Sequence, residues 1–161
     1  MTDQSLRGFL KMVENDFPAD FVRVSNPVRR ELDITSSVFE FERNGKSPVL
    51  MFDNVEGFGN PVVTNTAGNR RLLAAAVGVA PDDLPLAYRE RCQNYQRVEV
   101  VGDAPWQDIV LEGDDVDLTK LPIPLHFHVD AAPYITAGQI TARDPDGETD
   151  TVGFHRLMLK G

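Results

Sequence analysis

The side chains best suited to chemistry lie towards the end of the chain. His126 and His128 are two residues apart, so in an extended segment they would point to the same side, as a pair of metal ligands does. His155 would be the third ligand. Nothing in the sequence fixes its distance from the other two and no cysteine assists, so a packed loop is the simpler interpretation of the pair.

Arg156 suggests a different chemistry, the recognition of a carboxylate. A guanidinium group is a planar fork of donors that keeps its charge near neutral pH and pairs with a carboxylate through two hydrogen bonds. An arbitrary arginine on a hairpin is usually a surface residue, however, and a threonine such as Thr136 is common in strands because its side chain is β-branched. Residue type alone therefore leaves a binding role and a surface role open.

A β-hairpin is predicted to carry these residues. The segments 134–142 and 151–160 are rich in strand-forming residues, and the connection between them is rich in turn-forming Asp, Gly and Pro. Because side chains alternate between the two faces of a strand, one face should carry Thr151, Gly153 and His155 and the other Val152, Phe154 and Arg156. A cavity lined by both Thr151 and Arg156 would need a bulge or a sharp twist, for which Gly153 is the best-suited position.

The elements expected before the hairpin form a mixed α/β layer. Apolar residues at helical spacing predict helices after Ser5, over residues 28–41, after Asn69 and after Asp82 or Asp83, with Gly78 ending the third. Compact apolar runs predict strands at 21–27, 48–55, 61–65 and 97–101. Residues 103–133 are rich in Asp, Gly and Pro, and their last part, 121–133, contains three prolines, which favour an ordered extended loop. We therefore expect one domain over 1–102 and the start of another over 103–161.

Composition narrows the class of protein. The chain has 161 residues, 42% of them hydrophobic, which is enough for an ordinary core. Its formal net charge of -9 argues against binding to nucleic acid or to an anionic membrane. Cys92 is the only cysteine, so an intrachain disulfide is excluded and a reducing, cytoplasmic location is expected. No segment approaches the roughly 20 apolar residues of a membrane span, and the first residues do not read as an export signal.

Three segments in order give the chain a resemblance to a known family. They are LRGFLKMVE, then PVLMFDNVEGFGNPVVTNTAGNRRLLAAAVG, then LPIPLHFHVDAAPYITAGQITARDPDGETDTVGFHRLMLKG. In this order they resemble the N-terminal portion of the UbiD family of decarboxylases, whose early members were described as polyprenyl-hydroxybenzoate carboxy-lyases. The resemblance covers essentially the whole chain, and its most specific part is the last segment.

The resemblance implies both a fold and an activity. The fold would be the mixed α/β layer followed by the first strands of a split β-barrel of flavin-reductase type. The activity would be the removal of carbon dioxide from an aromatic or α,β-unsaturated carboxylic acid, with prenylated flavin mononucleotide (prenylated FMN) as the electron sink. The resemblance also implies Mn²⁺ and K⁺ at the cofactor, a flavin prenyltransferase that supplies it, and assembly as a homo-oligomer or with a second subunit.

The family's functional residues can be carried over where this sequence matches. Arg156 takes the place of the active-site arginine that fixes the substrate carboxylate, and Thr136 that of a threonine near the cofactor. Thr151 stands where many relatives have an asparagine that ligates the metal, and its shorter hydroxyl is a weaker ligand. The residues that would surround the cofactor between these two positions are Val152, Gly153, Phe154 and His155.

Two functions of other classes compete with the decarboxylase. The catalytic glutamates of the family lie beyond residue 161, so we expect this chain alone to be inactive. The first alternative is a non-catalytic assembly or cofactor-binding subunit of a split complex, and the second is a plain FMN-binding domain. A half-built barrel would also leave unpaired strand edges and apolar surface, which favours self-association or a second subunit.

Overall fold

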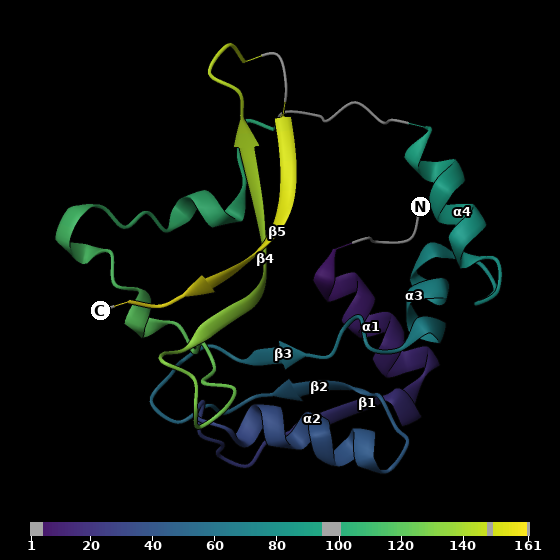
Figure 1. Ribbon diagram of the computed structural model, residues 1–161, viewed down its shortest axis with the longest axis horizontal. Coiled ribbons are helices and arrows are strands. Elements are labelled where there is room, and N and C mark those ends of the chain that lie inside the picture. Colours follow the sequence, from purple (N-terminus) through teal and green to yellow (C-terminus); the bar gives the residue numbers. More distant parts are fainter. Residues whose placement is uncertain (1–4, 95–100, 148–149, 161) are drawn as a thin grey trace. The chain divides into compact units, whose positions relative to one another are not determined.

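The computed structural model describes residues 5–94, 101–147 and 150–160. The elements are α1 (Leu6–Asp16), η1 (Pro18–Asp20), β1 (Phe21–Val24), α2 (Asp33–Arg43), β2 (Val49–Phe52), β3 (Val62–Thr64), α3 (Arg70–Val77), α4 (Leu84–Cys92), η2 (Pro105–Asp108), η3 (Gly113–Asp115), η4 (Leu118–Lys120), β4 (Tyr134–Arg143) and β5 (Asp150–Met158), where η marks a 3-10 helix (Figure 1). In this part of the chain no helix has the length and apolar character needed to cross a membrane.

The chain divides into two compact units. The first comprises Met1–Val22, Lys46–Leu50 and Asn65–Asp117, and the second Arg23–Gly45, Met51–Thr64 and Leu118–Gly161. Strands β1, β2 and β3 form one sheet in that order, and β4 and β5 form a separate two-stranded sheet. The structure therefore confirms a mixed α/β fold with small sheets, whereas the completion of a barrel and the boundary near residue 102 stay predictions.

Helices dominate the first unit, and their ends lie where the sequence predicts them. The Ser5 hydroxyl accepts a hydrogen bond from Gly8 N at 3.0 Å and the Asn69 side chain accepts one from Arg71 N at 3.0 Å, which caps α1 and α3. Helix α3 ends at Gly78, whose φ of 78° is the left-handed conformation that glycine adopts without strain. Helix α4 follows Asp83 as expected, but the Asp83 side chain makes no capping hydrogen bond.

A small apolar core holds this helical unit together. Helix α1 packs against α3, and α3 against α4 (Figure 1). The buried hydrophobic residues described in this unit come from α1, β2, α3 and the N-cap of η2, and they are Val13, Val49, Leu50, Leu72, Ala74 and Ala104. Helix α4 contributes no buried residue, and it packs against α3.

Helix α2, in the second unit, begins five residues later than the sequence predicts. The helix expected over residues 28–41 starts only at Asp33, so that prediction was wrong at its N-terminal end. Val28 N donates to Asn54 O and Val28 O accepts from Glu56 N, which places Val28 in a parallel bridge with Val55. Backbone groups already used in this extended pairing cannot form a helical turn.

A tight turn at Leu32 separates this extended segment from α2. Leu32 has a φ of 69°, and Asp33 N donates to Glu31 O across it. Such a conformation costs a non-glycine residue on the order of 1–3 kcal/mol and persists only where its surroundings fix it. Leu32 N donates to Leu125 O and Leu125 N to Arg30 O, so the 121–133 loop holds the turn from the outside.

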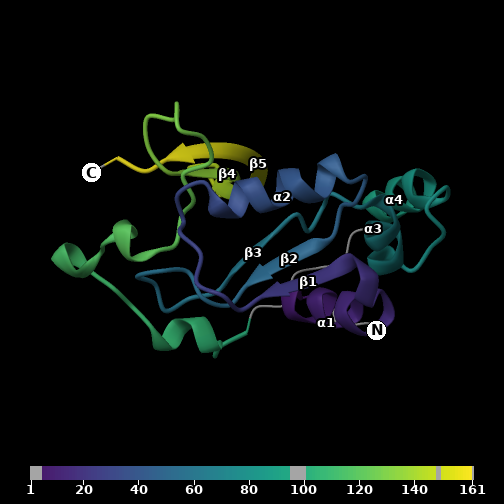
Figure 2. The ribbon, with the colours of Figure 1, turned by 90° about the horizontal axis from the view of Figure 1, so that it is seen from below.

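The remaining predicted strands agree with the structure. β1, β2 and β3 lie within the runs expected at 21–27, 48–55 and 61–65 (Figure 2). The core of this second unit consists of Ile34, Phe52, Val55 and Ile123. The strand expected at 97–101 lies outside the described residues except for its last position, which is not in a strand. The 121–133 loop is free of helix and leads directly into β4.

The terminal hairpin forms as predicted but is irregular at one point. β4 and β5 are antiparallel, with a regular register from Gly138↔His155 to Arg143↔Asp150. Between Ile135↔Leu157 and Gly138↔His155 the register shifts, because β4 advances three residues there while β5 advances two. One extra residue in β4 is a β-bulge, which bends its strand and redirects the side chains beside it.

Candidate functional site

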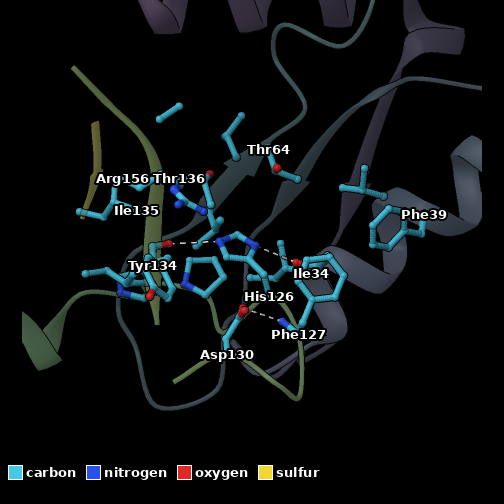
Figure 3. Close-up of a pocket in the computed structure, with 18 residues that line it drawn as sticks. Ile34, Phe39, Thr64, His126, Phe127, Asp130, Tyr134, Ile135, Thr136 and Arg156 are labelled. Atoms are coloured by element: carbon cyan, nitrogen blue, oxygen red, sulfur yellow. Dashed lines mark hydrogen bonds between the residues drawn. The ribbon is translucent and has the colours of Figure 1, made fainter. Parts of the chain in front are cut away.

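A pocket of about 750 Å³ opens within the second unit. Its walls are α2, β3, the 121–133 loop and the bulged end of the hairpin (Figure 3). Most of the lining is apolar, from Ile34, Val38, Phe39, Val62, Val63, Pro122, Ile123, Pro124, Phe127, Ile135 and Ala137. The polar lining consists of Thr35, Thr64, His126, Asp130, Tyr134, Thr136 and Arg156. Apolar walls with a few converging polar groups are typical of small-molecule sites.

The bulge brings Thr136 and Arg156 into this pocket together. The register leaves Thr136 and Ala137 both opposite Arg156, and all three line the cavity. Figure 3 shows Arg156 and Thr136 beside each other at the hairpin wall, across from Ile34 and Phe39 on α2. The structure thus places the predicted carboxylate-binding arginine and the predicted cofactor threonine in one cavity.

The bulge is not where the sequence predicts it. Gly153 pairs regularly with Ile140, and the ladder shows no irregularity between Asp150 and His155, so the expectation of a kink at Gly153 was wrong. The glycine leaves room for a side chain instead. A Cβ placed on Gly153 would lie 2.6 Å from His155 Nε2, because residues two apart share one face of the strand. The ring of His155 occupies that space.

Regular pairing in β5 keeps Thr151 away from Arg156. Thr151 pairs with Ala142 near the far end of the hairpin and is exposed, and it does not line the pocket. Val152 and Phe154, on the same face as Arg156, are 58% and 76% exposed and also lie outside the pocket lining. Of the residues predicted around the cofactor, only Thr136 and Arg156 therefore meet in this cavity.

Arg156 offers its guanidinium without a competing anion. Within the ranges the structure describes, no carboxylate forms an ion pair with it, whereas Arg143, on the same hairpin, is paired with Asp150 at 2.8 Å. Both arginines are exposed, so the difference lies in the partner and not in burial. An unpaired guanidinium beside an apolar wall can bind a carboxylate through two hydrogen bonds without first breaking an ion pair with an aspartate.

His126 joins three walls of the pocket. Its Nδ1 lies 3.0 Å from the Thr35 hydroxyl on α2, and its Nε2 lies 3.1 Å from Tyr134 O at the start of β4 (Figure 3). The structure describes no group of three or more His, Cys, Asp or Glu side chains that could hold a metal ion. His126, His128 and His155 therefore do not come together as a three-histidine site in the described chain.

The electrostatics of the pocket's frame come from the start of α2. Arg29 Nη2 and Nε donate to the two carboxylate oxygens of Asp33 at 2.9 and 3.2 Å, and Arg29 N donates to Asp33 Oδ2 at 3.0 Å. These hydrogen bonds, with the charge of Arg29, hold the pKa of Asp33 below its usual value. The hydrogen-bonded pair of Arg29 and Asp33 fixes the first turn of α2, and this turn contributes Ile34 and Thr35 to the pocket wall.

Sequence reasoning missed the contribution of α2 to the site. Ile34, Thr35, Val38 and Phe39 all line the pocket, and their i, i+4 spacing is visible in the sequence. That spacing marks an apolar helix face but does not say what the face packs against. The ring of Phe39 packs against that of Phe127 from the loop, with the ring centroids 5.9 Å apart and the ring planes tilted by 45°. These two residues are far apart in the sequence.

Two models of one protein family match the chain, and together they cover most of it. Residues 17–92 match the N-terminal domain of 3-octaprenyl-4-hydroxybenzoate carboxy-lyase, and residues 98–161 match its Rift-related domain. The two matches follow each other in the order of the chain.

Three solved structures share the fold over nearly the whole chain. The UbiD-class enzyme HmfF from Pelotomaculum thermopropionicum, in complex with FMN, is 34% identical with a TM-score of 0.85 over 97% of this chain. An evolved dimeric form of HmfF in complex with prFMN is also 34% identical, with a TM-score of 0.82 over 99%. The apo 3,4-dihydroxybenzoic acid decarboxylase from Enterobacter cloacae is 25% identical with a TM-score of 0.88 over 99%. The chain spans only about a third of these proteins, 34%, 36% and 35% of their lengths.

Proposed function

We propose a carboxylate-binding role in decarboxylation for this chain, which belongs to the UbiD family and corresponds to its N-terminal portion. In the complete enzyme the reaction would release carbon dioxide from an aromatic or α,β-unsaturated carboxylic acid. The single observation that carries the proposal is the unpaired guanidinium of Arg156 on the wall of a largely apolar pocket. Such a pocket suits a ligand with a flat apolar body and one carboxylate.

Each part of the pocket has a task in this proposal. Arg156 would hold the carboxylate by its planar fork, and Thr136 beside it would donate its hydroxyl to an oxygen of the substrate or the cofactor. Ile34, Phe39 and Phe127 would bind the apolar body of the acid and exclude water from it. Excluding water strengthens the attraction between guanidinium and carboxylate because the effective dielectric constant falls.

Prenylated FMN fits this chain only in part. When bound, it would supply the electron sink that the loss of carbon dioxide requires. The pocket's size, its aromatic residues and the Arg156–Thr136 pair suit contact with a planar ring system, and we propose that Val152, Gly153, Phe154 and His155 extend that contact along β5. The exposed Phe154 supports this extension, since 76% of its surface is available to cover a ligand or another strand.

Mn²⁺ and K⁺ at the cofactor stay predictions, since the described residues alone show no complete cluster of metal-binding side chains. Thr151 is exposed outside the pocket, and no group of three or more His, Cys, Asp or Glu side chains with metal-binding arrangement accompanies it in the described ranges. A threonine hydroxyl alone is a weak ligand for Mn²⁺. Thr151 as a metal ligand stays a prediction, and no step of the proposed function depends on it.

A titration with a matched neutral ligand tests the carboxylate-binding role. We expect the chain to bind benzoate more tightly than benzamide, which has the same ring without the charge. Arg156→Gln should lower benzoate affinity about tenfold, the loss of a charge-assisted hydrogen bond of about 1.5 kcal/mol, and leave benzamide unchanged. Arg143→Gln is the control, because Arg143 is an exposed arginine of the same hairpin that does not line the pocket. Equal affinities for the two ligands, or equal effects of the two variants, would remove the basis of the proposal.

We also propose that the chain needs a partner polypeptide or the remainder of a longer chain for turnover. By the family resemblance, the catalytic glutamates would lie beyond residue 161, and the chain spans about a third of the relatives' length. With prenylated FMN from a flavin prenyltransferase added, the 161-residue chain should release no carbon dioxide from cinnamate or hydroxybenzoates. Measurable release by the purified chain would contradict this. A cytoplasmic location is proposed with it, from the single cysteine.

A second function is favoured by the surface of the hairpin. Both faces of β4 and β5 are largely exposed, with Ile140, Val152 and Phe154 among the exposed apolar residues, and within the described residues each strand pairs only with the other. Such a hairpin suits an assembly subunit that completes its sheet with another chain or segment. Mass spectrometry of the flavin retained by the purified protein separates the options: prenylated FMN favours the decarboxylase, unmodified FMN a plain flavin-binding domain, and no flavin an assembly role.

A further inference from the structure

The hydrogen bonds of His126 define which ring nitrogen carries a proton. Tyr134 O is a carbonyl oxygen and can only accept, so Nε2, 3.1 Å away, must donate to it. In the neutral ring Nδ1 is then an acceptor, and the Thr35 hydroxyl donates to it over 3.0 Å. Both nitrogens are satisfied, and the half-buried ring is fixed in position and tautomer.

The ring holds the first residue of β4 from one side while the backbone holds it from the other. Tyr134 N donates to Pro124 O at 3.0 Å, and Tyr134 O accepts from His126. On the opposite edge Leu159 N donates to Pro133 O, which connects the end of β5 to the same point. The start of β4 is therefore fixed to the 121–133 loop as well as paired with the end of β5.

Through Thr35 the same ring reaches α2. Leu125, the residue before His126, is already bonded to Arg30 O and Leu32 N next to the tight turn. The Thr35 hydroxyl lies one turn further along, so the loop contacts both the turn and the helix that follows it. His126 thus connects α2 and β4, the two elements that face each other across the pocket.

The position of Arg156 depends on where this connection places β4. The bulge at Thr136 and Ala137 begins two residues after Tyr134 and lies opposite Arg156. A bulge is a local distortion that the flanking pairs must hold in place. On the C-terminal side the regular ladder starts at Gly138, and on the N-terminal side only two pairs, Tyr134↔Met158 and Ile135↔Leu157, precede the bulge. The hydrogen bonds of Tyr134 with Pro124 O and His126 Nε2 hold this short N-terminal part of β4 in place.

We propose that His126 is a positioning residue for the carboxylate site: its Nε2–H and Nδ1 hold Tyr134 of β4 and Thr35 of α2, and so set the bulge that places Thr136 beside Arg156. This proposal rests on the proposed function, since it assigns His126 to the site where Arg156 would bind a carboxylate. His126 touches the pocket but needs no contact with the reacting atoms.

Three substitutions separate the hydrogen bonds of the ring. In His126→Gln the side-chain amide nitrogen takes the place of Nε2 and keeps the donor to Tyr134 O, whereas His126→Leu keeps comparable bulk and loses both bonds. Thr35→Val removes only the Nδ1 partner. The probes are benzoate and benzamide, titrated into the 161-residue chain and followed by nitrogen-15 NMR, with a thermal melt of each variant to check folding.

The expected pattern distinguishes positioning from general stability. His126→Leu should weaken benzoate about tenfold, shift the amide signals of Thr136 and Ala137, and leave benzamide within about twofold. His126→Gln should restore benzoate affinity to within about threefold and leave those signals in place, and Thr35→Val should behave like His126→Gln. In the wild-type chain the ring signals should show a proton on Nε2.

Three results would overturn the role of His126. These are a wild-type ring without a proton on Nε2, a folded His126→Leu variant with unchanged Thr136 and Ala137 signals, and equal weakening of benzoate and benzamide, which is what a general loss of structure produces. If His126→Leu does not fold, the amide signals of Thr136 and Ala137 in His126→Gln and Thr35→Val decide whether His126 has this role. A wild-type chain that does not prefer benzoate defeats the proposed function, while the ring and amide signals still decide whether His126 sets the bulge.

Discussion

Replacing Gly138 by alanine tests the geometry of the bulge directly. Gly138 is the first regularly paired residue after the bulge, and it lies opposite His155. An ideal Cβ there would lie 3.1 Å from Leu157 Cδ1 and 3.2 Å from His155 O. The leucine methyl can move, but the carbonyl belongs to the paired strand and cannot withdraw without opening the ladder.

The expected change in hairpin stability for Gly138→Ala is the sum of two opposing effects. Glycine to alanine within a strand normally stabilises by about 0.5–1 kcal/mol. Overpacking costs about 1–3 kcal/mol, and the few tenths of an ångström required here place the cost in the middle of that range. We therefore expect Gly138→Ala to destabilise the hairpin by a net of about 1 kcal/mol, which corresponds to roughly fivefold faster amide exchange in β4 and β5.

Gly153→Ala is the matched control on the partner strand. Its Cβ would lie 2.6 Å from His155 Nε2, which is the far end of an exposed side chain that can rotate away. In Gly153→Ala the amide exchange rates of β4 and β5 should equal those of the wild-type hairpin or be lower. Hydrogen exchange followed by NMR or mass spectrometry measures both variants. Exchange in Gly138→Ala no faster than in Gly153→Ala would mean that the close approach behind the bulge does not exist, and the assignment of Thr136 to the pocket would fail with it.

Three further changes test other parts of the structure. Asp33→Asn should lower the free energy of unfolding in urea by about 1 kcal/mol at neutral pH, because it breaks the paired hydrogen bonds from the Arg29 guanidinium. Arg29 lowers the pKa of Asp33 from 3.8, so this stabilisation is complete above about pH 4. The difference in stability between the two proteins should vanish as the pH falls through the lowered pKa. Leu50→Ala should lower the free energy of unfolding by about 2–5 kcal/mol, since Leu50 is fully buried, and a change below about 1 kcal/mol would contradict that burial. Phe154→Asp should reduce self-association in sedimentation velocity, and an equally monomeric wild type would refute the idea that the hairpin face is an assembly surface.

Local signals in the sequence were sufficient for most element boundaries. Ser5, Asn69 and Gly78 act through hydrogen bonds and a φ angle that involve residues a few positions away, so their roles can be predicted from neighbours alone. The start of α2 could not be predicted in this way. Residues 28–32 have helical spacing, but their backbone groups pair with Asn54, Glu56 and Leu125, which only the folded chain brings near.

The site was predictable in its chemistry but not in its geometry. Arg156 and Thr136 were both expected to take part in binding, and the structure places them in one pocket. The apolar wall from α2 was not expected, because the spacing of Ile34 and Val38 predicts a buried face without naming its partner. Nor does any property of His126 in the sequence indicate that its ring connects Thr35 and Tyr134, which lie on different elements.

The rule of alternating faces explains why the pocket contains Thr136 and not Thr151. Along β5 the rule holds without exception from Asp150 to His155, so Thr151 and Arg156 point to opposite faces, as their odd and even positions require. The extra residue that could have changed this lies in β4, and an insertion in one strand alters the faces of that strand only. It therefore changes which β4 side chains accompany Arg156 and leaves Thr151 where it was. A role for Thr151 at the same ligand as Arg156 would require that ligand to extend around or along the hairpin, a demand that a cofactor with a long phosphate-bearing chain could meet and a small carboxylic acid could not.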